Sequence, residues 1–223
     1  MNQQDHDHDR DQRQAADPAP AIVYRLGDAL YLNVTNRCPN ACVFCIRESP
    51  QGVGYNLWLN EEPTADQIVQ AAGEIAQYRE VVFCGYGEPL LRPAIVIEVA
   101  RRLKQRAPVP IRINTNGLAD LFLGYDVLPQ LQGLIDGISI SLNAPDAQSY
   151  LELTKTPYGL KAFPAVCDFA RCSKLYIPKV TVSVVHYPGV DLERSAQVAA
   201  ALGVEFRVRE IQGFDQPDQQ GLE

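Results

Sequence analysis

The sequence lacks the features that would assign it to a membrane or to nucleic acid. In its 223 residues no apolar run is long enough to cross a bilayer. The N-terminus has no apolar stretch of the kind found in secretory signals. Lysine and arginine number 20 against 27 aspartate and glutamate, so no cationic excess favours non-specific binding to a phosphate backbone. We expect a cytoplasmic protein with no membrane attachment and no evident nucleic-acid binding.

The chain also gives no reason to expect disulfide bonds, because thiols stay reduced in the cytosol. Three of the six cysteines, Cys38, Cys42 and Cys45, gather in one short segment. The other three are scattered, and we expect them to be buried or idle thiols: Cys84, Cys167 and Cys172.

The composition divides the chain into one domain with two tails. Residues 1–20 are rich in Asp, Gln, Ala and Pro and have almost nothing apolar to bury, which predicts a disordered N-terminal tail. We expect one core domain over residues 21–212 and a flexible C-terminal tail over residues 213–223. No internal repeat and no linker divides the core.

From residue 21 onward, short β-branched or apolar runs alternate with helical stretches. Strands are predicted near 30–35, 80–84, 110–114, 136–142, 179–185 and 204–209. Helices are predicted near 64–78, 93–106, 146–154, 160–172 and 191–202, with a weaker one near 124–132. Repeated strand–helix units imply an α/β fold with a parallel sheet and right-handed crossovers.

Polar residues alternate with apolar ones along several of these strands. Ile111 and Ile113 alternate with Arg112 and Asn114, and the first, fourth and sixth predicted strands show the same pattern. A period of two places each polar row on one face of its strand. In a barrel the outer face packs on helices, while the inner face can be polar near a bound cofactor. We therefore expect a partial (β/α)6 TIM-like barrel with a polar ligand inside.

Three cysteines follow the first predicted strand directly. Cys38, Cys42 and Cys45 are spaced C-x3-C-x2-C. One loop can wrap three thiolates around a cubane iron–sulfur cluster, which leaves one iron open for substrate chemistry. A structural zinc site or a non-catalytic electron-carrying cluster would need a fourth ligand, for which Cys84 is the nearest candidate.

A second segment follows the second predicted strand. Residues 84–89 read Cys-Gly-Tyr-Gly-Glu-Pro. The glycines let the backbone approach a ligand closely, and Glu88 can accept a hydrogen bond from an ammonium group. On its own this pattern is more often a plain turn.

The cysteine spacing resembles the hallmark of the radical S-adenosylmethionine (SAM) superfamily, in which an aromatic residue precedes the last cysteine, as Phe44 does here. The resemblance implies a [4Fe–4S] cluster on the three cysteines and a SAM molecule bound to the fourth iron by its amino and carboxylate groups. Reductive cleavage of SAM would give a 5′-deoxyadenosyl radical for hydrogen abstraction. It also implies a low-potential electron donor such as flavodoxin or ferredoxin.

The same resemblance nominates residues that contact SAM. Segment 84–89 is similar to the family's Gly-Gly-Glu-Pro, which holds the amino group of SAM, although Tyr86 departs from that pattern. The implied cofactor contacts are Phe44, Gly85, Gly87, Glu88, Asn116, Ser141, Asn143, Val184 and Arg209. Within this set Val184 would meet adenine, and Arg209 would meet a carboxylate of SAM or of substrate.

Within the superfamily the chain most resembles the TatD nuclease-associated radical SAM proteins. The resemblance rests on segments 31–38, 82–89 and 138–145 and on Arg207-Val208-Arg209, and it implies no particular substrate. A glycyl-radical activase and a small-molecule enzyme are both compatible, and the lateral opening of a partial barrel is associated in this superfamily with large substrates such as proteins. The alternatives are an iron–sulfur protein for electron transfer or redox sensing and a zinc-binding module, but neither explains segments 84–89 and 138–145.

Overall fold

The computed structural model describes residues 19–49 and 52–211. The predicted tails lie outside these residues, apart from residues 19 and 20. The described strands form one sheet whose order follows the chain. They are β1 (Val23–Leu26), β2 (Ala29–Leu32), β3 (Glu80–Phe83), β4 (Ile111–Thr115), β5 (Gly137–Ser141), β6 (Lys179–His186) and β7 (Glu205–Glu210).

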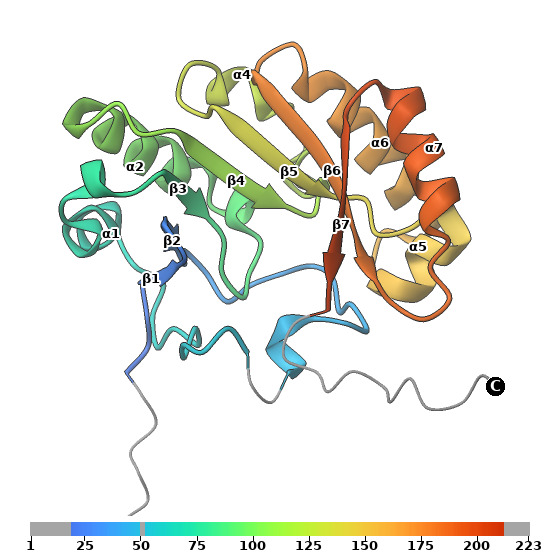
Figure 1. Cartoon of the computed structure of the whole chain (residues 1–223), viewed down its shortest axis with the longest axis horizontal. Coiled ribbons are helices and arrows are strands. Elements are labelled where there is room, and N and C mark those ends of the chain that lie inside the picture. The colour runs from blue at the N-terminus through green and yellow to red at the C-terminus, as the bar shows by residue number, and fades with distance from the viewer. Residues whose placement is uncertain (1–18, 50–51, 212–223) are drawn as a thin grey trace, which may run out of the picture.

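Strands β2 to β7 pair in parallel, and only β1 is antiparallel to its neighbour. In Figure 1 the sheet is curved, with helices along its outer side. The helices are α1 (Ala65–Ala72), α2 (Pro93–Arg106), α3 (Ala119–Leu123), α4 (Leu128–Leu131), α5 (Ala147–Thr154), α6 (Ala162–Ser173) and α7 (Leu192–Leu202). Six parallel strands in sequential order that do not close on themselves confirm the predicted partial barrel.

Strand β1 is absent from the sequence prediction. It forms a hairpin with β2 through the two residues Gly27 and Asp28, and Gly27 has a φ of 60°. A Gly-Asp pair between two apolar runs is a typical hairpin signal, because a tight turn of this kind needs a positive φ. The extra strand covers the edge of β2.

Two predicted helices are divided in the structure. The helix predicted over 64–78 begins as expected, with Thr64 and Gln67 forming a capping box, but it ends at Gly73. A separate 3-10 turn, η2 (Ile75–Gln77), follows. The weaker prediction near 124–132 corresponds to α4, while α3 precedes it and ends at Gly124, whose left-handed conformation stops the helix.

The alternation of polar and apolar residues separates the two faces of the sheet, as predicted. Ile111 and Ile113 on β4 are fully buried and belong to the core that the helices cover. Their neighbours Arg112 and Asn114 line a cavity on the inner face, as Ser139 of β5 does. The sheet thus has an apolar outer face and a polar inner face. Among the described residues, no helix is both long and apolar enough to span a membrane.

Candidate functional site: the cysteine loop and the inner cavity

The segment between β2 and α1 is long and has almost no regular structure. Residues 33–64 contain only the short 3-10 turn η1 (Ile46–Glu48) among their described parts. Figure 1 shows this pale-blue segment crossing below the sheet, on the side toward which β7 points. We call residues 35–48 the cluster loop. Because it forms no strand ladder, its backbone groups need partners elsewhere.

Two asparagines at the end of β2 supply some of these partners. The side chain of Asn33 is fully buried and donates to the carbonyls of Ala21 at 3.1 Å and Leu57 at 2.7 Å. Asn36 donates to the Leu59 carbonyl at 2.7 Å and accepts from the Leu59 amide at 3.1 Å. These bonds hold the cluster loop against the loop that follows it.

An ionic group fixes the start of the cluster loop. Arg92 donates to the carbonyls of Val34 at 2.7 Å and Pro63 at 2.9 Å, and its Nε lies 3.3 Å from Glu62. Glu62 also accepts from Arg37 at 2.6 Å. A single arginine from the turn before α2 therefore joins both ends of the long segment.

The middle of the cluster loop is attached to α5. The Ala41 amide donates to the Thr154 carbonyl at 3.0 Å, and the Val43 amide donates to the Leu153 carbonyl at 2.9 Å. Both carbonyls belong to the last turn of the helix, where they have no partner within the helix. These bonds give partners to the amides of the loop and to the carbonyls of the helix, and they place the cluster loop beside the end of α5.

The three cysteines lie close enough to affect one another's ionisation. Burial raises the pKa of Cys38, and it raises the pKa of Cys42 to about 12, with added repulsion from the neighbouring thiols. The guanidinium of Arg47 donates through Nε to the sulfur of Cys45 at 3.4 Å. Iron would deprotonate these thiols on binding, because a metal ion favours the thiolate.

The donor set fits a multi-iron cluster better than a single ion. In residues 19–49 and 52–211, no three His, Cys, Asp or Glu side chains converge closely enough to hold one metal ion. A cubane accepts each thiolate at a different iron, so its ligands stand farther apart than those of one zinc ion. Cys38, Cys42 and Cys45 would hold such a cluster. Cys84 instead lines the inner cavity.

The glycines of segment 84–89 pack directly against the segment that follows β2. A Cβ on Gly85 would lie 2.0 Å from Oδ1 of Asn33. A Cβ on Gly87 would lie 2.4 Å from the Thr35 carbonyl oxygen and 2.5 Å from that of Arg37. Real Cβ atoms do not approach this closely, so both positions require glycine.

Glu88 lies inside the protein, between the ends of β3 and β4. Its carboxylate accepts from Leu90 N at 3.0 Å, from Thr115 Oγ1 at 2.8 Å and from Asn116 N at 2.7 Å. Burial raises the pKa of Glu88 to about 7, although these three hydrogen bonds favour the ionised form. The side chain joins two neighbouring strand ends, and its direct contact with SAM stays a prediction.

Arg209 is a cation of the inner face without a carboxylate partner among the described residues. Its Nη2 donates to Ser141 Oγ at 3.4 Å and to Asn143 Oδ1 at 3.3 Å. Its Nε is buried and has no hydrogen-bond partner there. Burial lowers the pKa of Arg209, yet an arginine stays charged in proteins. The arrangement therefore suits an additional anion.

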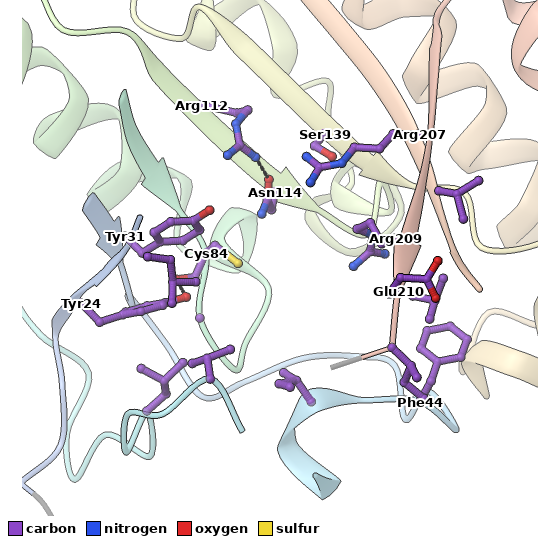
Figure 2. Close-up of a pocket in the computed structure, with 18 residues that line it drawn as sticks. Tyr24, Tyr31, Phe44, Cys84, Arg112, Asn114, Ser139, Arg207, Arg209 and Glu210 are labelled. Atoms are coloured by element: carbon purple, nitrogen blue, oxygen red, sulfur yellow. Dashed lines mark hydrogen bonds between the residues drawn. The ribbon is translucent and has the colours of Figure 1, made fainter. Parts of the chain in front are cut away.

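Arg209, Gly85 and Cys84 are among the residues that line a cavity of about 330 Å³ on the inner face of the sheet. Figure 2 shows that side chains from β1, β2, β4, β5 and β7 point into it, with Phe44 of the cluster loop at its margin. Phe44 also lies against Tyr187, with ring centroids 5.6 Å apart. The cavity thus lies between the cluster loop and the polar inner face.

The structure brings the predicted SAM contacts to four kinds of place. Phe44, Gly85 and Arg209 line the cavity. Ser141 and Asn143 do not line the cavity but accept hydrogen bonds from Arg209, which does. A third set lies in the packing between strand ends: Gly87, Glu88 and Asn116. Val184 is fully buried, and its neighbour Val185 lines the cavity instead.

Three residues that shape the candidate site were not identified from the sequence. Arg47 and Arg92 organise the cluster loop, and Tyr24 of β1 lines the cavity. Arg47 is only two residues beyond the last cysteine, so its position near the motif was a usable signal. Nothing local marks Arg92, because its contacts are with residues far away in the sequence.

The fold and the site together describe an open parallel barrel with a three-cysteine loop at its mouth. The family model for the radical SAM superfamily matches residues 32–201. The chain belongs to this superfamily, whose members use a [4Fe–4S] cluster and SAM. The predicted family is thereby confirmed, while the comparisons do not show the TatD-associated subfamily.

Curated relatives match more than half of the chain. A GTP 3′,8-cyclase of Lactiplantibacillus plantarum is 31% identical over 168 residues, which cover 74% of this chain and 47% of the cyclase. A probable dual-specificity RNA methyltransferase RlmN of Frankia casuarinae is 30% identical over 142 residues, covering 56% of this chain and 32% of that protein. The chain spans about half the length of the cyclases it matches.

Solved structures show the same fold at low sequence identity. TYW1 with a lysine-pyruvate adduct has a TM-score of 0.60 at 14% identity, with 82% of this chain and 64% of that one covered. A radical SAM methyltransferase from Sphaerobacter thermophilus has a TM-score of 0.54 at 18% identity, with 86% and 69% covered. These likenesses support the fold alone.

Replacing Gly87 should displace the cluster loop. In Gly87→Ala the new Cβ would overlap the carbonyl oxygens of Thr35 and Arg37, so we expect most of the iron and sulfide bound after anaerobic reconstitution to be lost. The matched control is Gly137→Ala, whose Cβ would make an ordinary 3.5 Å contact with the Arg112 side chain. Wild-type iron content in Gly87→Ala would refute the close-packing argument.

Replacing Arg47 should lower the reduction potential of a bound cluster. The arginine brings a positive charge and a hydrogen bond to the sulfur of Cys45, and both favour the more negative reduced state. We expect a more negative midpoint in Arg47→Met and a smaller change in Arg47→Lys, measured by redox titration with electron paramagnetic resonance. Equal potentials in all three proteins at equal cluster content would contradict this role.

Glu88 should make stability depend on pH. The unfolded carboxyl ionises near 4.5 and the folded one near 7, so the contribution of Glu88 to the free energy of unfolding falls as pH rises between these values. Glu88→Gln leaves a buried N–H unpaired, which costs about 1–3 kcal/mol, but it removes this pH dependence. Urea unfolding should therefore show a larger penalty near pH 5 than near pH 8.

The exposed carboxylate Glu98 on α2 provides the control for that experiment, because its side chain is about half exposed. Glu98→Gln should unfold close to the wild-type denaturant midpoint at both pH values. A Glu88→Gln penalty that is the same at both pH values would show that burial does not raise the pKa of Glu88.

Proposed function

We propose that this chain is a radical SAM enzyme that acts on a small molecule held in the inner cavity. The observation that carries the proposal is the position of the cluster loop, which presents three thiols and also contributes Phe44 and Ile46 to the cavity lining. A [4Fe–4S] cluster with bound SAM would supply reductive cleavage to a 5′-deoxyadenosyl radical that abstracts hydrogen from the substrate. A low-potential donor such as flavodoxin or ferredoxin would provide the electron.

The protein's own residues would bind and orient SAM. Arg209 faces the cavity with a buried, unpaired Nε, which supports a charge-assisted bond to the carboxylate of SAM. Ser141 and Asn143 accept hydrogen bonds from the same guanidinium and keep it in place. Asn143 adopts a φ of 57°, a left-handed conformation that asparagine tolerates better than most residues.

Segment 84–89 would hold the other end of the amino-acid part of SAM. Gly85 lines the cavity. Glu88 fixes the shape of this segment through its bonds to the end of β4. Asn116, whose side-chain nitrogen is buried without a partner among the described residues, is the next candidate contact.

The size of the cavity is compatible with a small-molecule ligand. A volume of about 330 Å³ is at the small end of the range for small-molecule sites. Several curated relatives are GTP 3′,8-cyclases, which also favours a small molecule. The resemblance to TatD-associated proteins adds no substrate.

The proposal predicts formation of 5′-deoxyadenosine. After anaerobic reconstitution and addition of SAM and dithionite, wild-type protein should release it, measured by liquid chromatography. Cys42→Ala should release none because a cluster ligand is lost, whereas Cys172→Ala, at an exposed thiol of α6, should match wild type. A wild-type preparation with a full four-iron cluster and bound SAM that gives no product would count against the proposal.

A further inference from the structure

Arg207 is a second cation of the inner cavity, and the proposed function does not use it. It lies on the edge strand β7, where it is exposed to solvent, and it also lines the cavity. The structure shows no ion pair and no hydrogen bond from its guanidinium to residues 19–49 or 52–211. A cation that lines a cavity without a counter-ion gives that cavity a positive potential.

The other charged groups of the cavity have partners. Arg112 forms a two-point ion pair with Glu80, with both nitrogen–oxygen distances at 2.9 Å, and also donates to Asn114. Glu210 lies 3.2 Å from the ring of His186. Arg207 and Arg209 therefore remain as two positive charges without an ion-pair partner among the described residues, beside the single carboxylate of Glu210 in the same lining.

The two free cations occupy separate places along the barrel. Arg207 is opposite Ser183 and Arg209 is opposite Val185 in the pairing of β6 with β7. Side chains two residues apart point to the same face, about 7 Å from one another along the strand. In Figure 2 the guanidinium of Arg207 extends toward Ser139 and Asn114, while that of Arg209 lies farther toward Phe44.

We propose that Arg207, with Ser139 and Asn114, binds a carboxylate or phosphate group of the substrate. This inference rests on the proposed function, in which Arg209 holds the carboxylate of SAM. The planar fork of arginine matches the oxygens of either anion, and the hydroxyl and amide groups can supply further donors. An anionic small molecule would then be held deeper in the barrel than SAM, so that its other end faces the cluster loop.

Binding of simple anions tests the inference without requiring turnover. Inorganic pyrophosphate and succinate would be titrated by calorimetry into anaerobically reconstituted protein saturated with SAM, at fixed ionic strength. We expect at least one probe to bind wild type, and about tenfold weaker binding in Arg207→Gln, since one charge-assisted contact is lost. The stronger probe identifies the anion as a phosphate or a carboxylate.

The control is Arg171→Gln, which removes the same charge from an exposed ion pair on α6 and should leave probe binding unchanged. The affinity for SAM should be equal in Arg207→Gln and wild type. The inference is overturned if neither probe binds wild type, if Arg207→Gln binds as tightly as wild type, or if Arg207→Gln loses SAM instead of the probe. Absence of 5′-deoxyadenosine with normal probe binding would refute the proposed function alone.

Discussion

The site depends on hydrogen bonds that other parts of the chain provide to the segment after β2. This segment carries the three cysteines, and in its described residues the short 3-10 turn η1 is the only regular element. Arg92 bonds to its start and its end, the end of α5 bonds to its middle, and Asn33 and Asn36 bond to the loop beyond it. Since buried backbone groups need partners, the positions of the cysteines depend on the strands and helices that supply these bonds.

This dependence joins the cluster loop to the strands that would bind SAM. Gly85 and Gly87 allow the turn after β3 to lie against the loop, and the amide of Glu88 donates to the Arg37 carbonyl at 2.8 Å. The carboxylate of Glu88 then bonds to the end of β4. A displacement of the cluster loop would therefore be transmitted to two strand ends, because the packed groups between them leave no free volume.

Sequence alone predicted the parts of the site that are local. The three cysteines, whose role as ligands stays a prediction, lie within one short segment, and the polar inner face follows from alternation in β4, β5 and β7. The adenine contact predicted at Val184 did not follow this alternation. On β6, Thr181 and Ser183 alternate with Val180, Val182 and Val184, so the pattern itself places Val185 on the polar inner face, and Val185 rather than Val184 lines the cavity. The role of Arg92 depends on tertiary contacts that no local pattern encodes.

The charges of the inner cavity link stability to ligand binding. A buried arginine without a counter-ion costs free energy. This cost applies to Arg209, whose Nε is buried, and not to Arg207, which is exposed on β7 at the edge of the sheet, although both cations face the same cavity. Pairing each with a carboxylate, as Arg112 is paired with Glu80, would remove that cost, but it would also fill the space and cancel the positive potential. Leaving Arg207 and Arg209 unpaired keeps this potential available to anions. The unliganded barrel is then less stable than its packing would allow, and bound anions restore the missing interactions.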